Sequence, residues 1–585
     1  MRLIETRLLD GPNVYRLEPA AKLEIAIGPR RSWSGPREPA AGSGVRLGAR
    51  APRTAWPQGV ALAAGWAGRL GRLDVGASPR VAVHRGSDPG HWIVAWRWSR
   101  ADRAQLVADA AFDLARRGLD PSRSGRRTPA AARLIARWRR RIRRAEGPGP
   151  AWIRDADRTI PVISISGTNG KSTTSRLISR ILHDAGRHVG TTTSDGVLVD
   201  ERLVEDGDWT GPGGAKAVLE RRDLDVAVLE TARGGLLLRG LGYESNEASV
   251  LTNVSSDHMD LQGIHTLPEL AEVKATICRV TRADGWVVLN ADDRWVAAVA
   301  RTVRAHVAYF TLRGARSARV GRHLAAGGRA YLVRDGVLGE AEGAAWRPIV
   351  DVADIPITLG GAARHNVANS LAAAGGARAL GASLEAVALG LRSFDGGHGA
   401  SPGRMNVFRR DARIVIVDFA HNEAGLAALL DVAAAVASGP LAPGNGPAGA
   451  RLPITAVVGT AGDRPADTLR GMGRLAAERV DRLALKETLR YLRGRQRGSV
   501  VAELRAGALA GGWRGELPVY ESETTALDAE LDRPVEDEVL VLLCHEARDA
   551  VFARLAERGF EPVTGASALR ALATASPPAG PRDRA

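Results

Sequence analysis

The sequence predicts an α/β fold with two successive units of alternating strands and helices, preceded by a smaller α+β region. Two observations lead to this prediction. From Thr159 onward, runs of branched apolar residues alternate with segments of helical period, and the pattern restarts near Pro402. Before Gly147 the chain is instead rich in Trp, Pro, Gly and Arg, with one clear strand and one amphipathic helix.

The length of 585 residues suits three or four domains. We expect an N-terminal α+β domain at residues 1–147 and a central domain at 148–400. A Rossmann-like C-terminal domain is expected at 401–573, followed by a disordered tail at 574–585. The first boundary rests on the G-P-G-P composition of residues 147–150, which is typical of a linker.

Composition narrows the class of protein. Cys278 and Cys544 are the only cysteines, so neither a disulfide framework nor a cysteine metal cluster is expected. The sequence has no signal peptide and no apolar run of membrane-spanning length, which favours a cytoplasmic protein without a membrane partner. The net charge of +16 suits ATP and an acidic substrate. No nucleic-acid partner is expected, because no zinc-ligand spacing or RNA-binding motif is present. Homo-oligomerisation stays open.

Basic residues are distributed unevenly. Residues 133–144 read R-L-I-A-R-W-R-R-R-I-R-R, which predicts either a solvated helical face, the more frequent case, or a helix that binds a polyanion. Arginine dominates elsewhere, so a retained lysine is a candidate for a role that arginine cannot take. The lysines are Lys22, Lys171, Lys216, Lys274 and Lys486.

A Gly-rich turn follows the first strand of the central unit. Residues 163–174 read I-S-I-S-G-T-N-G-K-S-T-T and lead into a helical pattern. This order is typical of a phosphate-binding loop, in which glycines admit phosphate oxygens and helix-start N–H groups face the anion. The spacing G-x-x-G-K-S is shorter than the common one, and a plain helix-capping turn is the alternative. The residues expected to bind the phosphates are Gly167, Thr168, Asn169, Gly170, Lys171, Ser172 and Thr173, with Ser172 also on magnesium.

Polar residues gather where predicted strands end, the position at which open α/β sheets bind ligands. Glu230 closes the run V-A-V-L-E and offers a carboxylate to Mg²⁺, unless it only serves a helix N-terminus. His258 lies between two aspartates and is a candidate metal ligand. Lys274 would repel a nearby metal unless it is modified or paired with an anion. Asn290 begins N-A-D-D, which either recognises a nucleotide or makes a turn.

The ordered motifs of the chain resemble those of the Mur ligase family. They read GTNGKST, LETARGGLLLRGLGYE, NVSSDHMDLQGIHTLPELAEVK, LNADD, RHNVANSLAAA, PGRMNV, VDFAHN and GDR. The set looks most like the C-terminal Mur-ligase half of cyanophycin synthetases, and the opening RLLDGPNVY resembles the start of their N-terminal domain. The resemblance implies a Mur-ligase-like P-loop central domain and a Rossmann-like C-terminal domain.

The resemblance also implies an activity, namely ATP- and magnesium-dependent amide formation through an acyl-phosphate. Position by position, it implies catalytic roles for Lys171, Glu230, His258, Lys274 and Arg404. Magnesium would be held by Ser172, Glu230, His258 and Lys274, the last after carbamylation into an anion. The nucleotide would also contact Asn290, Asn366, Asn369, Arg404, Asp418 and His421, with Arg404 on the γ-phosphate. The acceptor or amino acid would meet Lys486, Arg493 and Arg495.

One departure from the resembling enzymes bears on the substrates. They carry an ATP-grasp domain ahead of the Mur half, whereas residues 147–150 here lead straight to the phosphate loop. One ATP site should form one type of bond, so we expect an amino acid such as arginine to be joined to a carboxylate of a peptide or small acid. The alternatives are a folylpolyglutamate or poly-γ-glutamate ligase, and a non-catalytic ATP-binding module that docks an acidic polymer.

Overall fold

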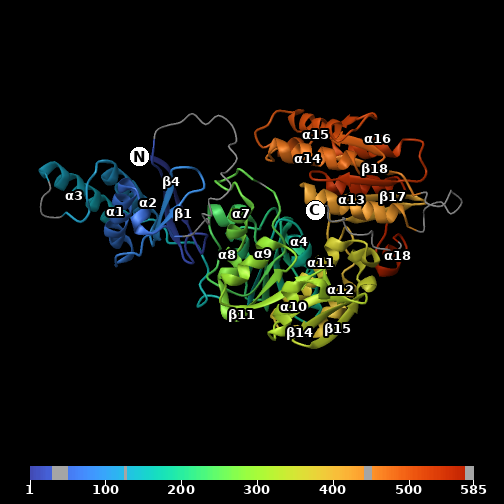
Figure 1. Ribbon diagram of the computed structural model, residues 1–585, viewed down its shortest axis with the longest axis horizontal. Helices are drawn as coiled ribbons and strands as arrows, with labels where there is room; N and C mark the ends of the chain where they lie inside the picture. Colours follow the sequence, from blue (N-terminus) through green and yellow to red (C-terminus); the bar gives the residue numbers. More distant parts are fainter. Residues whose placement is uncertain (29–49, 124–127, 258, 440–450, 574–585) are drawn as a thin grey trace.

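Three sheets follow one another along the chain, each with its own helices (Figure 1). A computed structural model of the protein describes residues 1–28, 50–123, 128–257, 259–439 and 451–573. His258 and the tail expected at 574–585 lie outside these residues. The α/β class predicted for the chain is confirmed. The domain boundaries stay predictions, although the three sheets occupy the expected order.

The first unit is an antiparallel four-stranded sheet packed on helices, in the order β1-β2-β4-β3. Its core joins Trp66 and Trp96, both fully buried, to small residues such as Ala108 that let the helices approach closely. The strands are β1 (Arg2–Leu9), β2 (Ala20–Ala26), β3 (Ala82–Arg85) and β4 (His91–Arg97). The helices are α1 (Gln58–Val75), α2 (Ala101–Arg116) and α3 (Pro129–Arg144).

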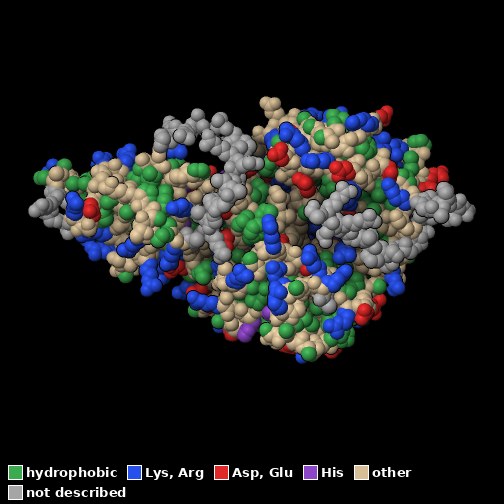
Figure 2. All heavy atoms as spheres, viewed as in Figure 1, with side chains coloured by type: hydrophobic (Ala, Val, Ile, Leu, Met, Phe, Trp, Pro, Cys, Tyr) green, Lys and Arg blue, Asp and Glu red, His purple; other side chains and the backbone are tan. Residues whose placement is uncertain are grey.

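Helix α3 carries the basic run at residues 133–144. Ile135 and Ile142 are its buried residues, while the polar face consists largely of exposed arginines. The prediction of a helix is confirmed, and its basic face is solvated. Figure 2 shows Lys and Arg side chains spread over all three parts of the visible face.

The central unit is an eleven-stranded sheet in the order β15-β14-β13-β12-β11-β10-β5-β9-β6-β7-β8. Strands β13 to β6 in this order run parallel, and antiparallel hairpins extend both edges. The inner strands are β5 (Val162–Ser166), β6 (Val189–Thr192), β9 (Val226–Glu230), β10 (Asn246–Leu251), β11 (Thr281–Asn290), β12 (His306–Thr311) and β13 (Arg329–Arg334). The edge strands are β7 (Gly196–Val199), β8 (Arg202–Asp206), β14 (Val337–Glu342) and β15 (Ala345–Asp351).

Helices cover both faces of this sheet, because alternate strand residues point to opposite sides. Val162 and Leu229 join the core under one layer, and Ile163 and Val228 join the core under the other. The first layer contains α5 (Pro212–Leu219), α6 (Arg233–Leu238), α7 (Leu267–Lys274), α8 (Thr276–Arg279), α9 (Arg294–Ala298) and α10 (Ala318–Ala325). The second contains α4 (Lys171–Asp184), α11 (Arg364–Ala379) and α12 (Leu384–Ser393).

The third unit is a seven-stranded sheet in the order β20-β19-β18-β21-β17-β16-β22. Its five strands from β20 to β17 run parallel, as a Rossmann-like unit requires. The strands are β16 (Asn406–Arg410), β17 (Arg413–Asp418), β18 (Ile454–Val458), β19 (Arg482–Lys486), β20 (Val519–Tyr520), β21 (Val539–Leu543) and β22 (Glu561–Pro562). The helices are α13 (Glu423–Ala437), α14 (Ala466–Ala477), α15 (Ser499–Ala510), α16 (Glu523–Leu531), α17 (Arg548–Glu557) and α18 (Ala566–Arg570).

The loop after β1 leaves the first sheet and packs on the central unit. Asp10 N–H donates to the Arg239 carbonyl at 2.7 Å, and its carboxylate pairs with the Arg239 guanidinium at 2.7 Å. The Leu241 N–H donates to the Pro12 carbonyl at 2.8 Å, and Val14 joins the central core. The first unit is therefore fastened to the segment that follows α6.

Among the described residues, every helix is too short or too polar to span a bilayer.

Candidate functional site

The Gly-rich turn at residues 167–170 joins β5 to α4 at the carboxyl edge of the central sheet. Gly170 has a φ of 82°, and an added Cβ would come within 2.3 Å of Asn369 Oδ1. A Cβ on Gly167 would come within 1.9 Å of Thr252 Oγ1. Both positions therefore need glycine, which keeps the turn compact and leaves its N–H groups at the start of α4.

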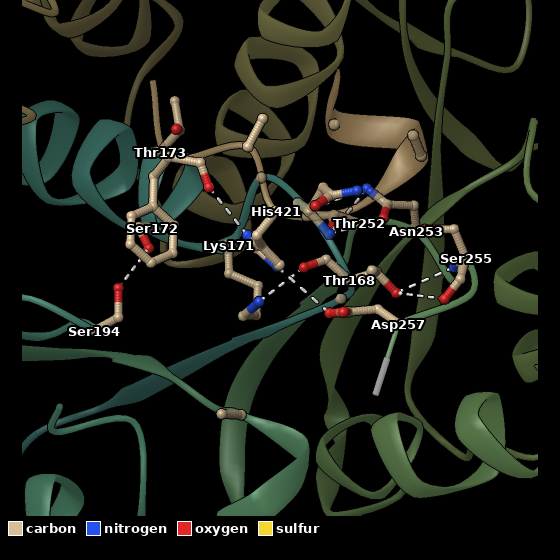
Figure 3. Close-up of a pocket in the computed structure, with 18 of the residues that line it drawn as sticks. Thr168, Lys171, Ser172, Thr173, Ser194, Thr252, Asn253, Ser255, Asp257 and His421 are labelled. Atoms are coloured by element: carbon tan, nitrogen blue, oxygen red, sulfur yellow. Dashed lines mark hydrogen bonds and ion pairs between the residues drawn. The ribbon is translucent and has the colours of Figure 1, made fainter. Parts of the chain in front are cut away.

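The end of the neighbouring strand β10 holds the turn in place. Thr252 Oγ1 and Asn253 Nδ2 donate to the Asn169 carbonyl at 2.7 and 2.9 Å. Asn253 Oδ1 accepts from the Asn169 N–H at 2.9 Å, and the Thr168 N–H donates to the Asn253 carbonyl at 2.9 Å. Figure 3 shows Thr168, Thr252 and Asn253 lying close together. The turn is therefore fixed before any ligand contacts it.

Two lysines approach the turn from different elements. Lys171 Nζ donates to the Thr168 carbonyl at 2.9 Å, and Lys274 Nζ, at the end of α7, donates to the Gly167 carbonyl at 2.6 Å. Lys274 is buried, and this desolvation together with the nearby Lys171 charge holds its pKa well below the usual value. An amine in this state is readily neutral, which is the form that reacts with CO₂ to give a carbamate.

Glu230 supplies a carboxylate beside these cations. It is the last residue of β9, it is buried, and its Oε2 has no hydrogen-bond partner within the described residues. Burial raises the pKa of Glu230, which the Lys171 charge only partly offsets. An orphaned buried carboxylate oxygen on a residue that interacts with the Ser172 side chain fits a hard, oxygen-binding cation such as Mg²⁺.

The third unit provides the opposite wall of the cavity. Arg404 Nη2 donates to Ser194 Oγ at 3.1 Å and to Ser172 Oγ at 3.5 Å, and its guanidinium lies 4.8 Å over the Phe419 ring. Asp418 Oδ2 accepts from the Met405 N–H at 2.7 Å, and burial raises the pKa of Asp418. The Arg404 guanidinium therefore contacts Ser172 in the first turn of α4.

His421 and the asparagines complete the lining. His421 Nε2 lies 3.5 Å from Asp257 Oδ2, and burial lowers the pKa of His421. Asn290 Nδ2 donates to the Thr252 carbonyl at 2.8 Å. Asn369 Nδ2 donates to Asn366 Oδ1 at 3.0 Å, which fixes both amides at the start of α11.

A single cavity of about 1020 Å³ brings these groups together. It is lined by every predicted catalytic, nucleotide-binding and metal-binding residue that the structure describes, namely Gly167, Thr168, Asn169, Gly170, Lys171, Ser172, Thr173, Glu230, Lys274, Asn290, Asn366, Asn369, Arg404, Asp418 and His421. His258 lies outside the described residues. The volume exceeds what a nucleoside triphosphate alone needs and leaves space for a second ligand.

One weaker expectation for the third unit is wrong. Lys486 is fully buried and does not line the cavity, because its Nζ pairs with Glu523 Oε1 at 2.9 Å. Arg493 does line the cavity. The Arg495 guanidinium donates to the Gly462 and Arg464 carbonyls, at 2.7 and 2.9 Å.

Polar contacts between the two walls were missed by sequence reasoning. The side-chain amides of Asn169 and Asn422 exchange hydrogen bonds of 3.1 and 3.0 Å. Asp195 accepts from Arg548 of the third unit at 2.6 Å and from Arg176 of α4 at 3.2 Å. Burial acts to raise the pKa of Asp195, but three neighbouring guanidinium groups outweigh it and hold the pKa below its ordinary value. The motif V-D-F-A-H-N, which ends at Asn422, could have indicated this residue as a site residue. Asp195 lies in no recognised motif, so no sequence signal pointed to it.

Comparison with known proteins gives one family. Residues 165–377 match the Mur ligase middle domain. Cyanophycin synthetase of Trichormus variabilis is 38% identical over 392 residues, which cover 67% of this chain and 42% of the relative. The chain thus spans less than half the length of the cyanophycin synthetases it matches. UDP-N-acetylmuramoyl-L-alanyl-D-glutamate–2,6-diaminopimelate ligase of Corynebacterium efficiens is 30% identical over 375 residues, covering 62% of this chain and 63% of the relative.

A solved structure of E. coli FolC in complex with ADP, without folate substrate, aligns at 20% identity with a TM-score of 0.48, covering 68% of this chain and 90% of that chain.

Proposed function

Since the chain belongs to the Mur ligase family, we propose that it is an ATP-dependent ligase that joins an amino acid to the carboxylate of a peptide or small acid. The observation that carries the proposal is the convergence of Lys171, Glu230, Lys274 and Arg404 on one cavity between two α/β units. A phosphoryl transfer needs charge neutralisation on several sides of the phosphate chain, and this arrangement supplies cations from both walls.

The proposed reaction has two steps. The substrate carboxylate attacks the γ-phosphorus of ATP, so that the bond to the β–γ bridging oxygen breaks and ADP leaves. The acyl-phosphate is then attacked by the amine, which loses a proton as the amide forms and inorganic phosphate departs. In both steps the protein holds the reacting groups together and keeps bulk water away from the acyl-phosphate.

Residues of both walls take defined parts in this proposal. Turn N–H groups and Lys171 bind the phosphates, and Arg404 neutralises the charge on the γ-phosphoryl oxygens during transfer. Glu230, Ser172 and a carbamylated Lys274 would hold Mg²⁺, which supplies further neutralisation when bound. Asn366 and Asn369 face the nucleoside portion.

The substrates are proposed from the cyanophycin synthetase relatives. Arginine joined to an aspartyl side chain is the first pair to test, because the cyanophycin synthetase of Trichormus variabilis is 38% identical over 392 residues. Acidic substrates also suit the arginines that line the cavity, such as Arg233 and Arg493.

The test is substrate-dependent release of ADP, with products identified by mass spectrometry. The purified chain is offered ATP and Mg²⁺ with arginine and aspartyl or β-aspartyl peptides, and separately with glutamate and folate or poly-γ-glutamate. We expect ADP release only when both an acid and an amine are present, and release that is slower by about a hundredfold or more in Lys171→Ala. Turnover with glutamate and folate or poly-γ-glutamate, but not with arginine and the aspartyl peptides, would favour the polyglutamate alternative. ATP binding without turnover across the panel would favour the non-catalytic module and contradict the proposal.

A further inference from the structure

A second group of metal-binding side chains lies away from the cavity, where the first sheet meets the loop ahead of α7. Glu24 in β2, Asp88 in the β3–β4 turn and His91 at the start of β4 each offer one ligand atom, and these atoms all lie within 4.8 Å of one another. His265 of the central unit faces the same group. We propose that Glu24, Asp88, His91 and His265 bind one divalent transition-metal ion of the Zn²⁺ class, which fastens the first unit to the central unit.

The spacing of the four side chains suits a tetrahedral ion. With metal–ligand bonds of about 2.0–2.2 Å, neighbouring ligand atoms lie about 3.3–3.6 Å apart. His91 Nδ1 is 2.8 Å from Glu24 Oε1 and 3.8 Å from Asp88 Oδ2, while Asp88 Oδ1 is 3.2 Å from His265 Nε2. Glu24, Asp88 and His91 therefore already lie within reach of one ion. His265 contacts this group through Asp88 and would become the fourth ligand by a movement of its side chain.

The orientation of His265 is the second observation in favour of a metal. Its Nδ1 lies 2.8 Å from Asp260 Oδ1, while its buried Nε2 lies 3.2 Å from Asp88 Oδ1. Metal-binding histidines generally donate one ring N–H to a carboxylate, which fixes the tautomer and presents the other nitrogen to the ion. Asp260 occupies the position of that carboxylate.

The ammonium group of Lys22 also contacts one of the four proposed ligands, Glu24. Lys22 Nζ lies 2.7 Å from Glu24 Oε2 and 2.9 Å from Glu5 Oε2. It therefore occupies the outer oxygen of Glu24 and leaves Oε1 toward His91. Two imidazole nitrogens with two carboxylate oxygens favour Zn²⁺ over Mg²⁺ or Ca²⁺, which prefer sites made wholly of oxygen.

The location gives the ion a role. His265 stands two residues before α7 (Leu267–Lys274), and Lys274 at the end of that helix contacts the phosphate-binding turn. An ion bound to His265 would therefore hold α7 against the first sheet. The contact made by Asp10 and Arg239 joins the same two units at another point.

The test is direct metal binding by the full chain. Protein stripped with a chelator and dialysed is titrated with ZnCl₂ by calorimetry, in competition with a chromophoric chelator of known affinity. We expect one Zn²⁺ equivalent that is lost or weakened at least tenfold in His91→Ala and in His265→Ala. His188→Ala is the matched control, because its imidazole also faces a carboxylate, Asp200 at 3.0 Å, but its side chain is 69% exposed and lies outside the proposed site. That control should bind as the parent does.

Two results would overturn the proposal: no Zn²⁺ bound by the stripped protein, or equal affinity and stoichiometry in the parent and in both cluster variants. Thermal melting of the metal-free variants shows whether they fold as the metal-free parent does. Should either variant fail to fold, Co²⁺ added to the parent chain decides the matter. A tetrahedral site with two imidazoles gives strong visible absorption that Zn²⁺ displaces, whereas weak octahedral absorption contradicts the assignment.

Discussion

The two walls of the cavity are held in different ways. The wall from the central unit is fixed by its own neighbours, since Thr252 and Asn253 bind the turn and Lys274 bonds to the Gly167 carbonyl. The wall from the third unit meets it through a few polar contacts, among them the Asn169–Asn422 amide pair. Under the proposed function, the first wall would be a preformed cradle for phosphate, and the second would be a cover that opens by breaking a small number of polar bonds.

The largest effect is expected at the cradle. Lys171→Ala removes a cation that makes one hydrogen bond, to its own turn, so the fold should persist while phosphate neutralisation is lost. We expect kcat to fall about 10²- to 10³-fold, measured by ADP release, with an unchanged thermal melting curve. Substantial activity in this variant would show that the cradle has been assigned to the wrong residues.

A substitution in the wall from the third unit should lower kcat less than Lys171→Ala does, and Arg404→Lys tests this. Lysine keeps the charge but loses the planar fork that reaches Ser194 and Ser172. Loss of charge-assisted hydrogen bonds predicts a fall in kcat of about 10- to 100-fold. Arg410→Lys, which alters an arginine stacked on Phe560, is the matched control and should leave kcat unchanged. Equal kcat values in the two variants would place Arg404 outside the reaction.

Opening of the cover is tested at Asp195. Asp195→Asn weakens the contact with Arg548 across the two units, so the open form should gain population and the KM for ATP should rise about fivefold. Small-angle scattering should show a larger radius of gyration. Asp200→Asn serves as control, because Asp200 pairs with His188 inside one unit. A KM that rises equally in both variants would argue against a closing contact.

The smallest effect concerns the joint with the first unit, outside both walls. In metal-free protein, hydrogen bonding to Asp88 raises the pKa of His265 to about 9, with Asp260 and the nearby carboxyl charges acting in the same direction. The protonated form is the one that stabilises the fold, so the contribution is complete below about pH 6.5 and is lost as the pH rises through about 9. Partial exposure limits it to about 1 kcal/mol.

This pH dependence is measured by urea unfolding of chelator-treated protein between pH 6 and 10. His265→Gln should remove the decrease in the free energy of unfolding between about pH 6.5 and 9, and should leave the slope of the curve unchanged outside that range. A parent curve and a variant curve of identical slope would mean that Asp88 does not stabilise the imidazolium.

Much of the fold was predictable because its signals are local. The alternation of apolar runs and helical periods located β5, β9, β10 and most strands of the third unit. The edge hairpin of β7 and β8 was missed, since β8 consists of exposed residues without an apolar face. Helix α1 was also missed, because its alanines and glycines give only a weak periodic pattern.

The site was predictable where a motif carried it. Gly167 to Thr173 and Glu230 stand at strand ends in recognisable patterns, and the structure places them on one cavity. Asp195 and Arg548 were not predictable, because they are 353 residues apart and their pairing depends on how two units meet. Lys486 was wrongly predicted for the same reason, since only the fold shows that its ammonium group forms an ion pair with Glu523.

The loop from Asp10 to Val14 also bears on how the chain is made. Its partner Arg239 is 229 residues further along, so at ordinary rates of translation about 10–45 s pass between their syntheses. During that time the ribosome holds a nascent chain whose first strands have no place to anchor the Asp10 carboxylate or bury Val14. The loop would be accessible to chaperones during this interval. A first unit expressed without the central unit would also lack the partner that binds this loop.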